Sequence, residues 1–274
     1  MRSEHAAWVA GTFAAHSVPR YYVDLAANHP THESQTKDLE LQGWRGLCIE
    51  PKPRFAEMLR AERACTTIDA VIDSTEREVN FTFGKGAMGG IVDEEFDNRY
   101  HWRVRDELRP VHTRRLQDVL GSCDAPNVID YLSVDVEGAE AQVLPASFPW
   151  QAFTFLTVTI ERPPPQLSQR LFRSGYLFAR TIGLGDVAFV HSTHPNATKA
   201  ADNSSFVQVP AKCHNRQIVY PERNKLKGVR YNSIFGCCTF PGFPQHTMPY
   251  TAPTSISAFG PAKGHDHGRA LTVD

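Results

Sequence analysis

Two stretches of this 274-residue chain place polar residues directly after apolar runs. The first, 21–36, is an apolar run that stops at Asp24 and gives way to small residues and a turn containing Asn28. The second, 129–140, is another apolar run, followed by acids of which Asp135 is the first. If both runs are strands, these carboxylates and the backbone N–H groups beside them lie at strand carboxyl ends, where open α/β sheets bind ligands. We expect the two strand ends to face one pocket.

Strand and helix patterns alternate along the chain and would position these residues. A helix is expected between Pro30 and Gly43, with Thr31 or Ser34 as its N-cap, because proline pushes the preceding residue out of the helical region and glycine ends helices. Strands are expected at 21–25, 45–50, 66–72, 79–83, 128–134, 155–161, 176–182 and 187–191, and other helices at 53–63, 114–120, 136–144 and 166–174. This order predicts an α/β fold with a mostly parallel sheet and an antiparallel edge strand.

The chain divides into four parts. Residues 1–19 form a lead-in with little periodicity, and 20–191 hold the α/β domain. Residues 192–240 form a C-terminal extension with one or two strands, 217–220 and 228–235, that could make an appended hairpin. The part beyond 240, residues 241–274, is rich in Pro, Gly, Ser and His and is expected to be a disordered tail.

A glycine-rich segment, GKGAMGG at 84–90, precedes the polar stretch 93–109. A phosphate-binding role is conceivable, but the lysine and hydroxyl spacing of a P-loop is absent. We therefore interpret the segment as a flexible surface loop.

Composition excludes several classes of protein. With 41% hydrophobic residues, the chain can build a real core, and its net charge of −1 gives no field that would attract nucleic acid or an anionic membrane. No apolar run approaches the roughly 18 residues of a membrane span. The first 20 residues make a poor signal peptide because charged and histidine residues interrupt their apolar patch.

The cysteines and sequons do not decide the cellular compartment of the protein. The six cysteines form no C-x-x-C pair and no zinc-like group with histidine, so we interpret them as buried or idle thiols. Three sequons, which matter only in a secretory lumen, occur at Asn80, Asn196 and Asn203. The cytoplasm is slightly favoured, and a secretory lumen stays open.

A set of motifs carries a resemblance to a known family: VDLAAN at 23–28, GWRGLCIEPKP at 43–53, Arg63 with Cys65, GGIV at 89–92, IDYLSVDVEGAE at 129–140 and TVTIERP at 157–163. Together they resemble the FkbM family of S-adenosylmethionine-dependent methyltransferases. The resemblance implies a Rossmann-like class I methyltransferase fold, with a seven-stranded sheet and helices on both faces. It also implies S-adenosyl-L-methionine as cofactor and O-methylation of a hydroxyl on a sugar or another small metabolite.

On this resemblance, Glu50 ends the second strand and would accept the ribose hydroxyls. Asp24 and Asn28 border the turn that would receive the methionyl group, while Asp69 and Ala70 match the positions that flank adenine. The residues expected to bind the cofactor are Asp24, Ala26, Asn28, Glu50, Asp69, Ala70 and Asp135.

Methyl transfer to oxygen needs alignment of three atoms and, where required, removal of a proton. Asp135 could act as the base or orient the acceptor, and Glu137 and Glu161 could assist or supply oxygen ligands to a divalent cation. Alternatively, Glu137 and Glu140 only stabilise a helix N-terminus. Two other possible bases, each more typical of a surface site, are His101 and His112.

The turn after the first strand departs from the family pattern, since Ala26 and Pro30 stand where glycines are usual. Alanine adds a methyl group and proline removes a donor, which bears on cofactor affinity. A catalytically silent ligand-binding or interaction domain on the same fold is therefore the alternative. A nicotinamide-dependent oxidoreductase is disfavoured because no G-x-G-x-x-G follows the first strand. The acceptor, the oligomeric state and any metal requirement are not identified.

Overall fold

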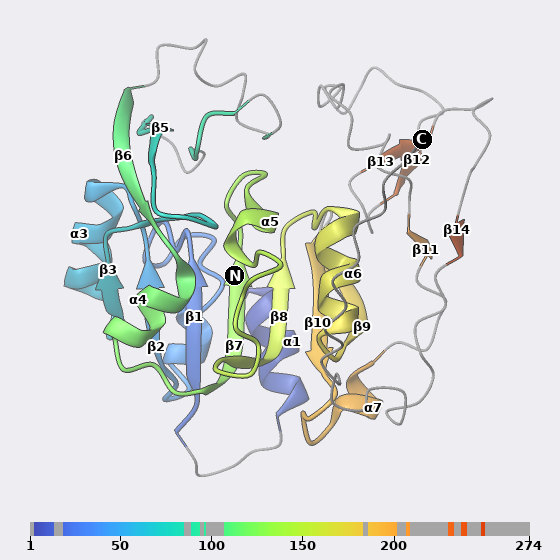
Figure 1. The fold of residues 1–274 in the computed structure, drawn as a ribbon. Coiled ribbons are helices and arrows are strands. Elements are labelled where there is room, and N and C mark those ends of the chain that lie inside the picture. The colour runs from blue at the N-terminus through green and yellow to red at the C-terminus, as the bar shows by residue number, and fades with distance from the viewer. Residues whose placement is uncertain are drawn as a thin grey trace, which may run out of the picture.

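The computed structural model describes residues 3–13, 19–84, 89–93, 96, 107–182 and 186–201. It also describes the backbone of four short strands farther along: β11 (Val207–Gln208), β12 (Arg230–Asn232), β13 (Cys237–Thr239) and β14 (Met248–Pro249). A seven-stranded sheet with helices on both faces forms the centre of the fold (Figure 1).

The central sheet has the strand order β3-β2-β1-β7-β8-β10-β9. Its members are β1 (Tyr21–Leu25), β2 (Arg45–Ile49), β3 (Thr66–Ile68), β7 (Val128–Val134), β8 (Thr154–Ile160), β9 (Tyr176–Ile182) and β10 (Asp186–His191). The predicted α/β fold with a mostly parallel sheet is confirmed, although the antiparallel strand is not at the edge. It is β10, which lies one place inward and pairs antiparallel with both β8 and β9.

Proline and capping signals in the sequence mark the start of some helices but not of others. They are α1 (Glu4–Thr12), α2 (Lys37–Glu40), α3 (Pro53–Glu62), α4 (Leu116–Ser122), α5 (Glu140–Val143), α6 (Pro165–Arg173) and α7 (Ala197–Ala200). Both α3 and α6 begin with proline, whose fixed φ suits the first helical position. In Figure 1, α4 and α6 lie in front of the sheet and α1 lies behind it.

The two faces of the sheet bury two separate cores. On one face, Val23 and Leu25 of β1 pack in a cluster that includes side chains of α4, α5 and α6. On the other, Tyr22 and Tyr131 pack with side chains of α1, α2 and α3. Neighbouring strand residues point to opposite faces, so β1 and β7 contribute to both cores. A strand covered on both faces reads as a continuous apolar run, which is why β7 was predicted with its observed bounds.

A second sheet of three strands lies beyond β3. It has the order β4-β6-β5 and consists of β4 (Val71–Ile72), β5 (Glu78–Thr82) and β6 (Leu108–Arg114). The prediction of one strand over 66–72 is wrong, because Thr66–Ile68 pair with β2 whereas Val71–Ile72 pair with β6. The last two residues of the polar stretch 93–109 also belong to this sheet, because β6 begins at Leu108.

Three other regions differ from the predictions. Residues 1–19 contain α1, whose Ala6 and Val9 are buried against the central sheet. The helix expected after Pro30 begins only at Lys37. Glu33 adopts a positive φ of 58°, which a helix does not allow, and Ser34 Oγ accepts a hydrogen bond from the Lys37 N–H (3.2 Å). The helix after Asp135 is a single turn, since Glu137 and Gly138 adopt positive φ before it.

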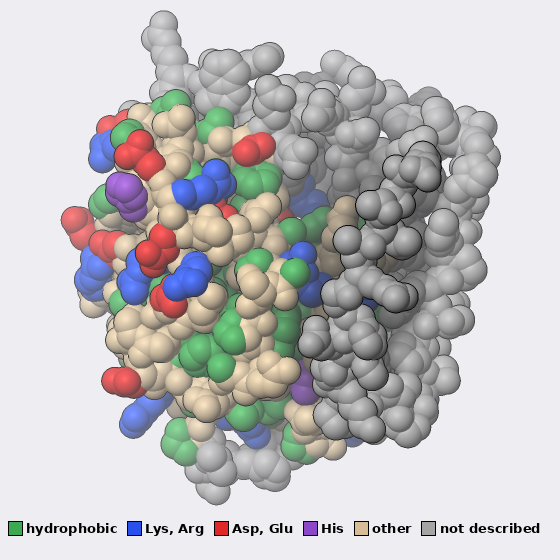
Figure 2. All heavy atoms as spheres, in the orientation of Figure 1, with side chains coloured by type: hydrophobic (Ala, Val, Ile, Leu, Met, Phe, Trp, Pro, Cys, Tyr) green, Lys and Arg blue, Asp and Glu red, His purple; other side chains and the backbone are tan. Residues whose placement is uncertain are grey.

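Farther along, β12 lies within the predicted strand 228–235 and pairs antiparallel with β13. The predicted strand 217–220 lies outside the described residues, as does most of the predicted tail, from which only β14 is described; it pairs with β11. On the face seen in Figure 2, acidic and basic side chains are interspersed. Among the described residues, no helix is long and apolar enough to cross a membrane.

Candidate functional site

A cavity opens at the carboxyl ends of the central strands. It holds about 510 Å³ of space, including its mouth, and residues following β1, β2 and β7 line it together with parts of the small sheet. In the sheet, β1 lies between β2 and β7. After β1 the chain adds strands β2 and β3 on one side of β1, and later adds β7 on its other side, so the strand order reverses at β1. Ligands of open α/β sheets bind at such a switch point. The expectation that both strand ends contribute to one pocket agrees with Leu25 and Val136 in its wall.

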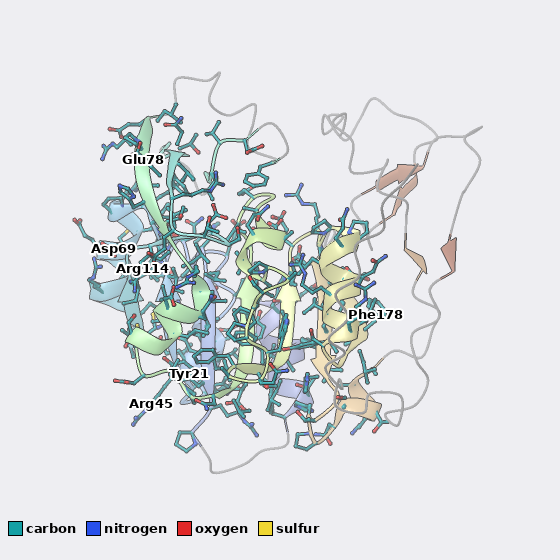
Figure 3. The ribbon with its side chains drawn as sticks, viewed as in Figure 1. Tyr21, Arg45, Asp69, Glu78, Arg114 and Phe178 are labelled. Carbon is teal, nitrogen blue, oxygen red and sulfur yellow. A yellow bond between two sulfur atoms is a disulfide. The ribbon has the colours of Figure 1, made fainter. Side chains whose placement is uncertain are left out.

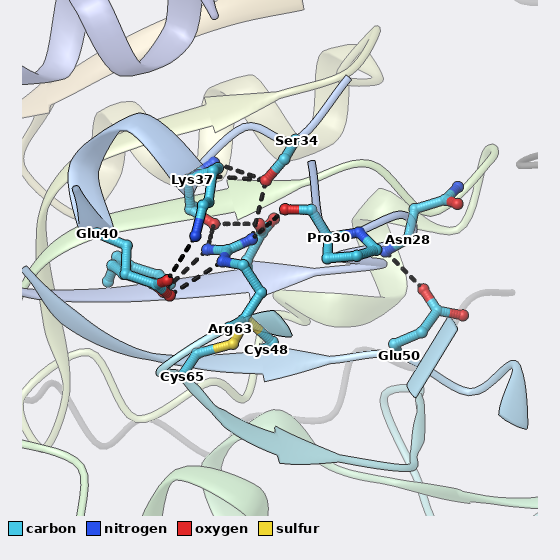
Figure 4. Close-up of a disulfide and its surroundings, with 12 residues drawn as sticks. Asn28, Pro30, Ser34, Lys37, Glu40, Cys48, Glu50, Arg63 and Cys65 are labelled. Carbon is cyan, nitrogen blue, oxygen red and sulfur yellow. Dashed lines mark hydrogen bonds and ion pairs between the residues drawn. A yellow bond between two sulfur atoms is a disulfide. The ribbon is translucent and has the colours of Figure 1, made fainter. Parts of the chain in front are cut away.

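Glu50 follows β2 and supplies a carboxylate to the cavity. One carboxylate oxygen accepts the backbone N–H of Asn28 at 2.8 Å (Figure 4). The other accepts the backbone N–H of Lys52, also at 2.8 Å. Burial raises the pKa of Glu50 to about 7, although both N–H donors favour the charged form. Each oxygen keeps acceptor capacity for a further donor. Two hydroxyl groups of a ligand could therefore bind this carboxylate.

The turn after β1 has a backbone that usually needs glycine. Ala26 has φ 57° and Asn28 has φ 54°, both in the left-handed region. Asparagine tolerates this region through local hydrogen bonds, whereas alanine pays a steric cost. The Ala27 N–H donates to the Ile49 carbonyl (3.2 Å), which ties the turn to β2. Ala26 thus adopts a conformation that glycine would reach without this cost, and it lines the cavity.

Asp24 is buried and points toward a network behind the turn. Its carboxylate accepts the Thr36 hydroxyl (2.6 Å), and Thr36 in turn accepts a guanidinium N–H of Arg63 (3.0 Å). Burial raises the pKa of Asp24 to about 6, opposed by the Thr36 hydrogen bond and the Arg63 charge. Asp24 is not among the residues that line the cavity. Its direct contact with a cofactor stays a prediction, and its observed contacts support the turn.

Arg63 is the centre of this network, with its side chain fully buried. It donates to Glu40 (2.9 Å), the Pro30 carbonyl (3.2 Å) and Ser34 Oγ (3.0 Å), as Figure 4 shows. It also donates to the Tyr22 hydroxyl (3.0 Å). Every donor direction of the guanidinium is used, so the segment between β1 and α2 is fixed to the end of α3.

Cys48 and Cys65 form a disulfide, with 5.9 Å between their Cα atoms. The interpretation of all cysteines as buried or idle thiols is therefore wrong for this pair; of the described cysteines, Cys123 is free. Cys48 lies in β2 and Cys65 directly precedes β3, so adjacent parallel strands bring them together. Sequence spacing did not reveal the pair because the two residues are 17 positions apart and meet only through strand pairing.

Asp135 and Glu161 follow the neighbouring strands β7 and β8 and lie side by side. Burial raises the pKa of Asp135 to about 7. Burial and the charge of Asp135 raise the pKa of Glu161 well above its usual value. Their mutual hydrogen bond lowers the pKa of Asp135 but raises that of Glu161, whereas the charge of Arg162 lowers the pKa of Glu161. Val136, the next residue after Asp135, lines the cavity.

A guanidinium already balances this acidic group. Arg162 Nη2 lies 2.6 Å from Glu161 Oε1 and 4.0 Å from Glu137 Oε2. Among the described residues, no group of three or more His, Cys, Asp or Glu could hold a metal ion. The buried Glu140 accepts the N–H groups of Val136 (3.3 Å) and Gly138 (3.0 Å), which agrees with the alternative that it stabilises the turn before α5.

The remaining predicted site residues do not all lie at the cavity. Ala70 lines the cavity, whereas the exposed Asp69, labelled in Figure 3, forms an ion pair with Arg60 of α3. His112, on β6 of the small sheet, is exposed. Its Nε2 lies 3.8 Å from Oε2 of Glu78 on β5. His101 lies outside the described residues.

Sequence reasoning missed one wall of the cavity. The interpretation of 84–90 as a surface loop is wrong for Gly90, which is buried; Gly89 and Gly90 line the cavity beside Phe81 and Ile91. Lys52, also in the lining, was passed over. The signal was present in the GGIV motif, but nothing in the sequence showed that it pairs with β5.

Comparison with protein families finds a match to the Methyltransferase FkbM domain over residues 24–180, more than half of the chain. The chain belongs to the FkbM methyltransferase family. The matched region begins at Asp24 of β1 and ends in β9, so it covers all or part of every strand of the central sheet except β10. This membership supports a methyltransferase. A comparison with curated proteins finds no match.

Proposed function

We propose that this FkbM domain is an S-adenosyl-L-methionine-dependent methyltransferase that methylates a hydroxyl oxygen of a sugar or another small metabolite. The observation that carries the proposal is the cavity at the switch point, in which Glu50 presents two anchored carboxylate oxygens between apolar walls. A nucleoside has the matching chemistry, because its ribose offers two neighbouring hydroxyl donors and its base offers an apolar face.

The residues present fit the cofactor. Glu50 would hold the ribose hydroxyls, and Ile49, Ala70 and Ile72 would contact the base. The turn at Ala26 and Asn28 would lie along the methionyl part, since it borders the same cavity. When bound, the cofactor supplies an electrophilic methyl group on a positively charged sulfur.

We assign proton removal to the Asp135 and Glu161 pair. The hydrogen bond between the two carboxyl groups lowers the pKa of Asp135, so we assign to the Asp135 carboxylate the role of accepting the proton of the acceptor hydroxyl. A pKa of about 7 places Asp135 near the value at which a base works efficiently at neutral pH. Glu137 and Arg162 set the charge around the pair. Because Arg162 already provides a positive charge there, the proposed mechanism uses no divalent cation.

The first experiment is calorimetric titration of the purified protein with S-adenosylmethionine and S-adenosylhomocysteine, with and without magnesium. Micromolar binding of both is expected. Glu50→Ala should weaken it by about 1–3 kcal/mol, since the lost acceptor is charged. Glu57→Ala on the exposed side of α3 is the matched control and should bind normally. A folded sample that binds neither compound would favour the silent-domain alternative.

A second experiment tests the base. Once a screen of hydroxylated compounds yields an acceptor, Asp135→Asn should lower turnover at least tenfold while the affinity for S-adenosylhomocysteine changes less than threefold. Equal turnover in the variant would remove the catalytic role of Asp135.

A further inference from the structure

Lys52 is buried to an unusual degree for a lysine. Only 5% of its surface is exposed, although lysine side chains are rarely buried without a specific arrangement. It directly precedes α3, and its backbone N–H is one of the two donors that hold Glu50. Its side chain extends into the cavity lining rather than toward solvent. Lys52 therefore contacts Glu50 through its backbone, while its ammonium group contacts another part of the cavity.

The ammonium end of Lys52 lies against the glycine-rich segment. Its Nζ lies 3.4 Å from the Gly84 carbonyl and 5.9 Å from the ring centroid of Phe55. A Cβ added at Gly89 would lie 2.7 Å from both Nζ and Cε of Lys52 and 2.7 Å from the Thr82 carbonyl. The backbone at Gly89 thus packs directly on the ammonium group, in a space that a side chain would fill.

Beyond Gly89, residues 89–92 form a wall of the cavity. Thr82 and Gly90 exchange hydrogen bonds, Thr82 N–H to the Gly90 carbonyl (3.1 Å) and Gly90 N–H to Thr82 Oγ1 (3.1 Å). Ile91 bridges Phe81, and the Val92 N–H donates to the Asn80 carbonyl (2.9 Å). The wall is therefore hydrogen-bonded to β5 along one side, and its glycine end packs against Lys52.

Lys52 also acts on Glu50 through its charge. Burial is the largest influence on the pKa of Glu50 and raises it, while the two backbone N–H donors lower it. Of the charged groups, Lys52 lowers this pKa and Asp24 on β1 raises it. Removing the ammonium group would therefore make Glu50 harder to ionise.

We propose that Lys52 is a positioning residue of the cavity: its ammonium group holds the 89–92 wall in place while its charge keeps Glu50 ready to accept hydroxyl donors. This proposal rests on the proposed function for the identity of the ligand. The position of the wall does not depend on that identity, so the two can fail separately.

The experiment combines amide hydrogen exchange of the ligand-free protein with titration by S-adenosylhomocysteine. In Lys52→Met, exchange at Gly90 and Val92 should accelerate at least tenfold. Affinity at pH 7 should fall at least tenfold, and part of this loss should disappear by pH 9, where Glu50 ionises without help. Lys52→Arg should restore exchange and affinity to within threefold of the native protein. Arg54→Met, an exposed neighbour on α3, is the control and should change neither.

If Lys52→Met folds poorly, Lys52→Gln tests the same contact, because it keeps a polar side chain and removes the ammonium charge. Native exchange at Gly90 and Val92 in a folded Lys52→Met protein would overturn the proposal. If the native protein does not bind S-adenosylhomocysteine, the proposed function fails, and the exchange comparison alone decides whether Lys52 holds the wall.

Discussion

The backbone N–H of Asn28 donates a 2.8 Å hydrogen bond to Glu50 Oε2, which joins the turn after β1 to the carboxylate after β2. The two residues are 22 positions apart, yet parallel pairing of β1 and β2 places both strand ends together. One interaction thus orders the turn and orients the acid. The four predictions below test this arrangement and the groups that support it.

Binding of S-adenosylhomocysteine should depend on pH through Glu50. Its pKa is raised by burial to about 7. In the proposed cofactor complex, only the ionised form would accept both ribose hydroxyls. The dissociation constant should therefore fall as pH rises from 6 to 8, and titration calorimetry would measure it. For folding, the sign is opposite, because a raised carboxyl pKa contributes stability below about pH 4.5 that is lost as pH rises through 7. A Glu50→Gln protein should bind weakly with a flat profile over this range; an unchanged slope would contradict the assignment.

Ala26→Gly should stabilise the protein. The left-handed φ of 57° costs alanine about 1–2 kcal/mol, whereas glycine adopts it freely and loses about 0.5–1 kcal/mol in chain entropy. Denaturant unfolding should show a net gain of about 0.5–1 kcal/mol. Ala27→Gly, at a buried neighbour without positive φ, is the control and should destabilise. If both changes destabilise equally, the turn is not strained at Ala26.

Arg63→Lys should destabilise the protein by about 3–5 kcal/mol, since it leaves Glu40 and the Ser34 and Thr36 hydroxyls without their guanidinium donor. A lysine cannot reproduce the planar set of donors. Chemical denaturation is the measurement. The half-exposed Arg60 of the same helix gives the control, since Arg60→Lys should change stability by less than about 0.5 kcal/mol. Equal effects would mean that the network adds little.

Loss of the Cys48–Cys65 disulfide should lower stability. For a loop closed over 17 positions, the chain-entropy model gives about 3 kcal/mol. Cys48→Ala with Cys65→Ala should show this loss in urea, and a reducing agent should lower the melting temperature of the native protein but not of the variant. Cys123→Ala is the control for thiol removal. A native protein that is insensitive to reductant, with free thiols at Cys48 and Cys65 by mass spectrometry, would contradict the disulfide.

Much of the central fold could be read from apolar runs. The runs at β1, β7 and β9 predicted the observed bounds. For β1 and β7, in the middle of the sheet, the reason is that strands covered on both faces are mostly apolar. The prediction of one strand over 66–72 was wrong, since this stretch divides between two sheets at Asp69 and Ala70. No local pattern records which partner strand each half will meet.

The sequence by itself determined the α/β class, the family and the placement of acids at strand ends, because strand period and motif order are local properties of the chain. Only the tertiary structure decided how those acids are used. It turned Asp24 toward Thr36, brought Asp135 beside Glu161, joined Cys48 to Cys65, and made Lys52 and Gly89 part of the cavity. Each of these depends on contacts between segments far apart in the chain, where burial and pairing, rather than residue type, set the role of a side chain.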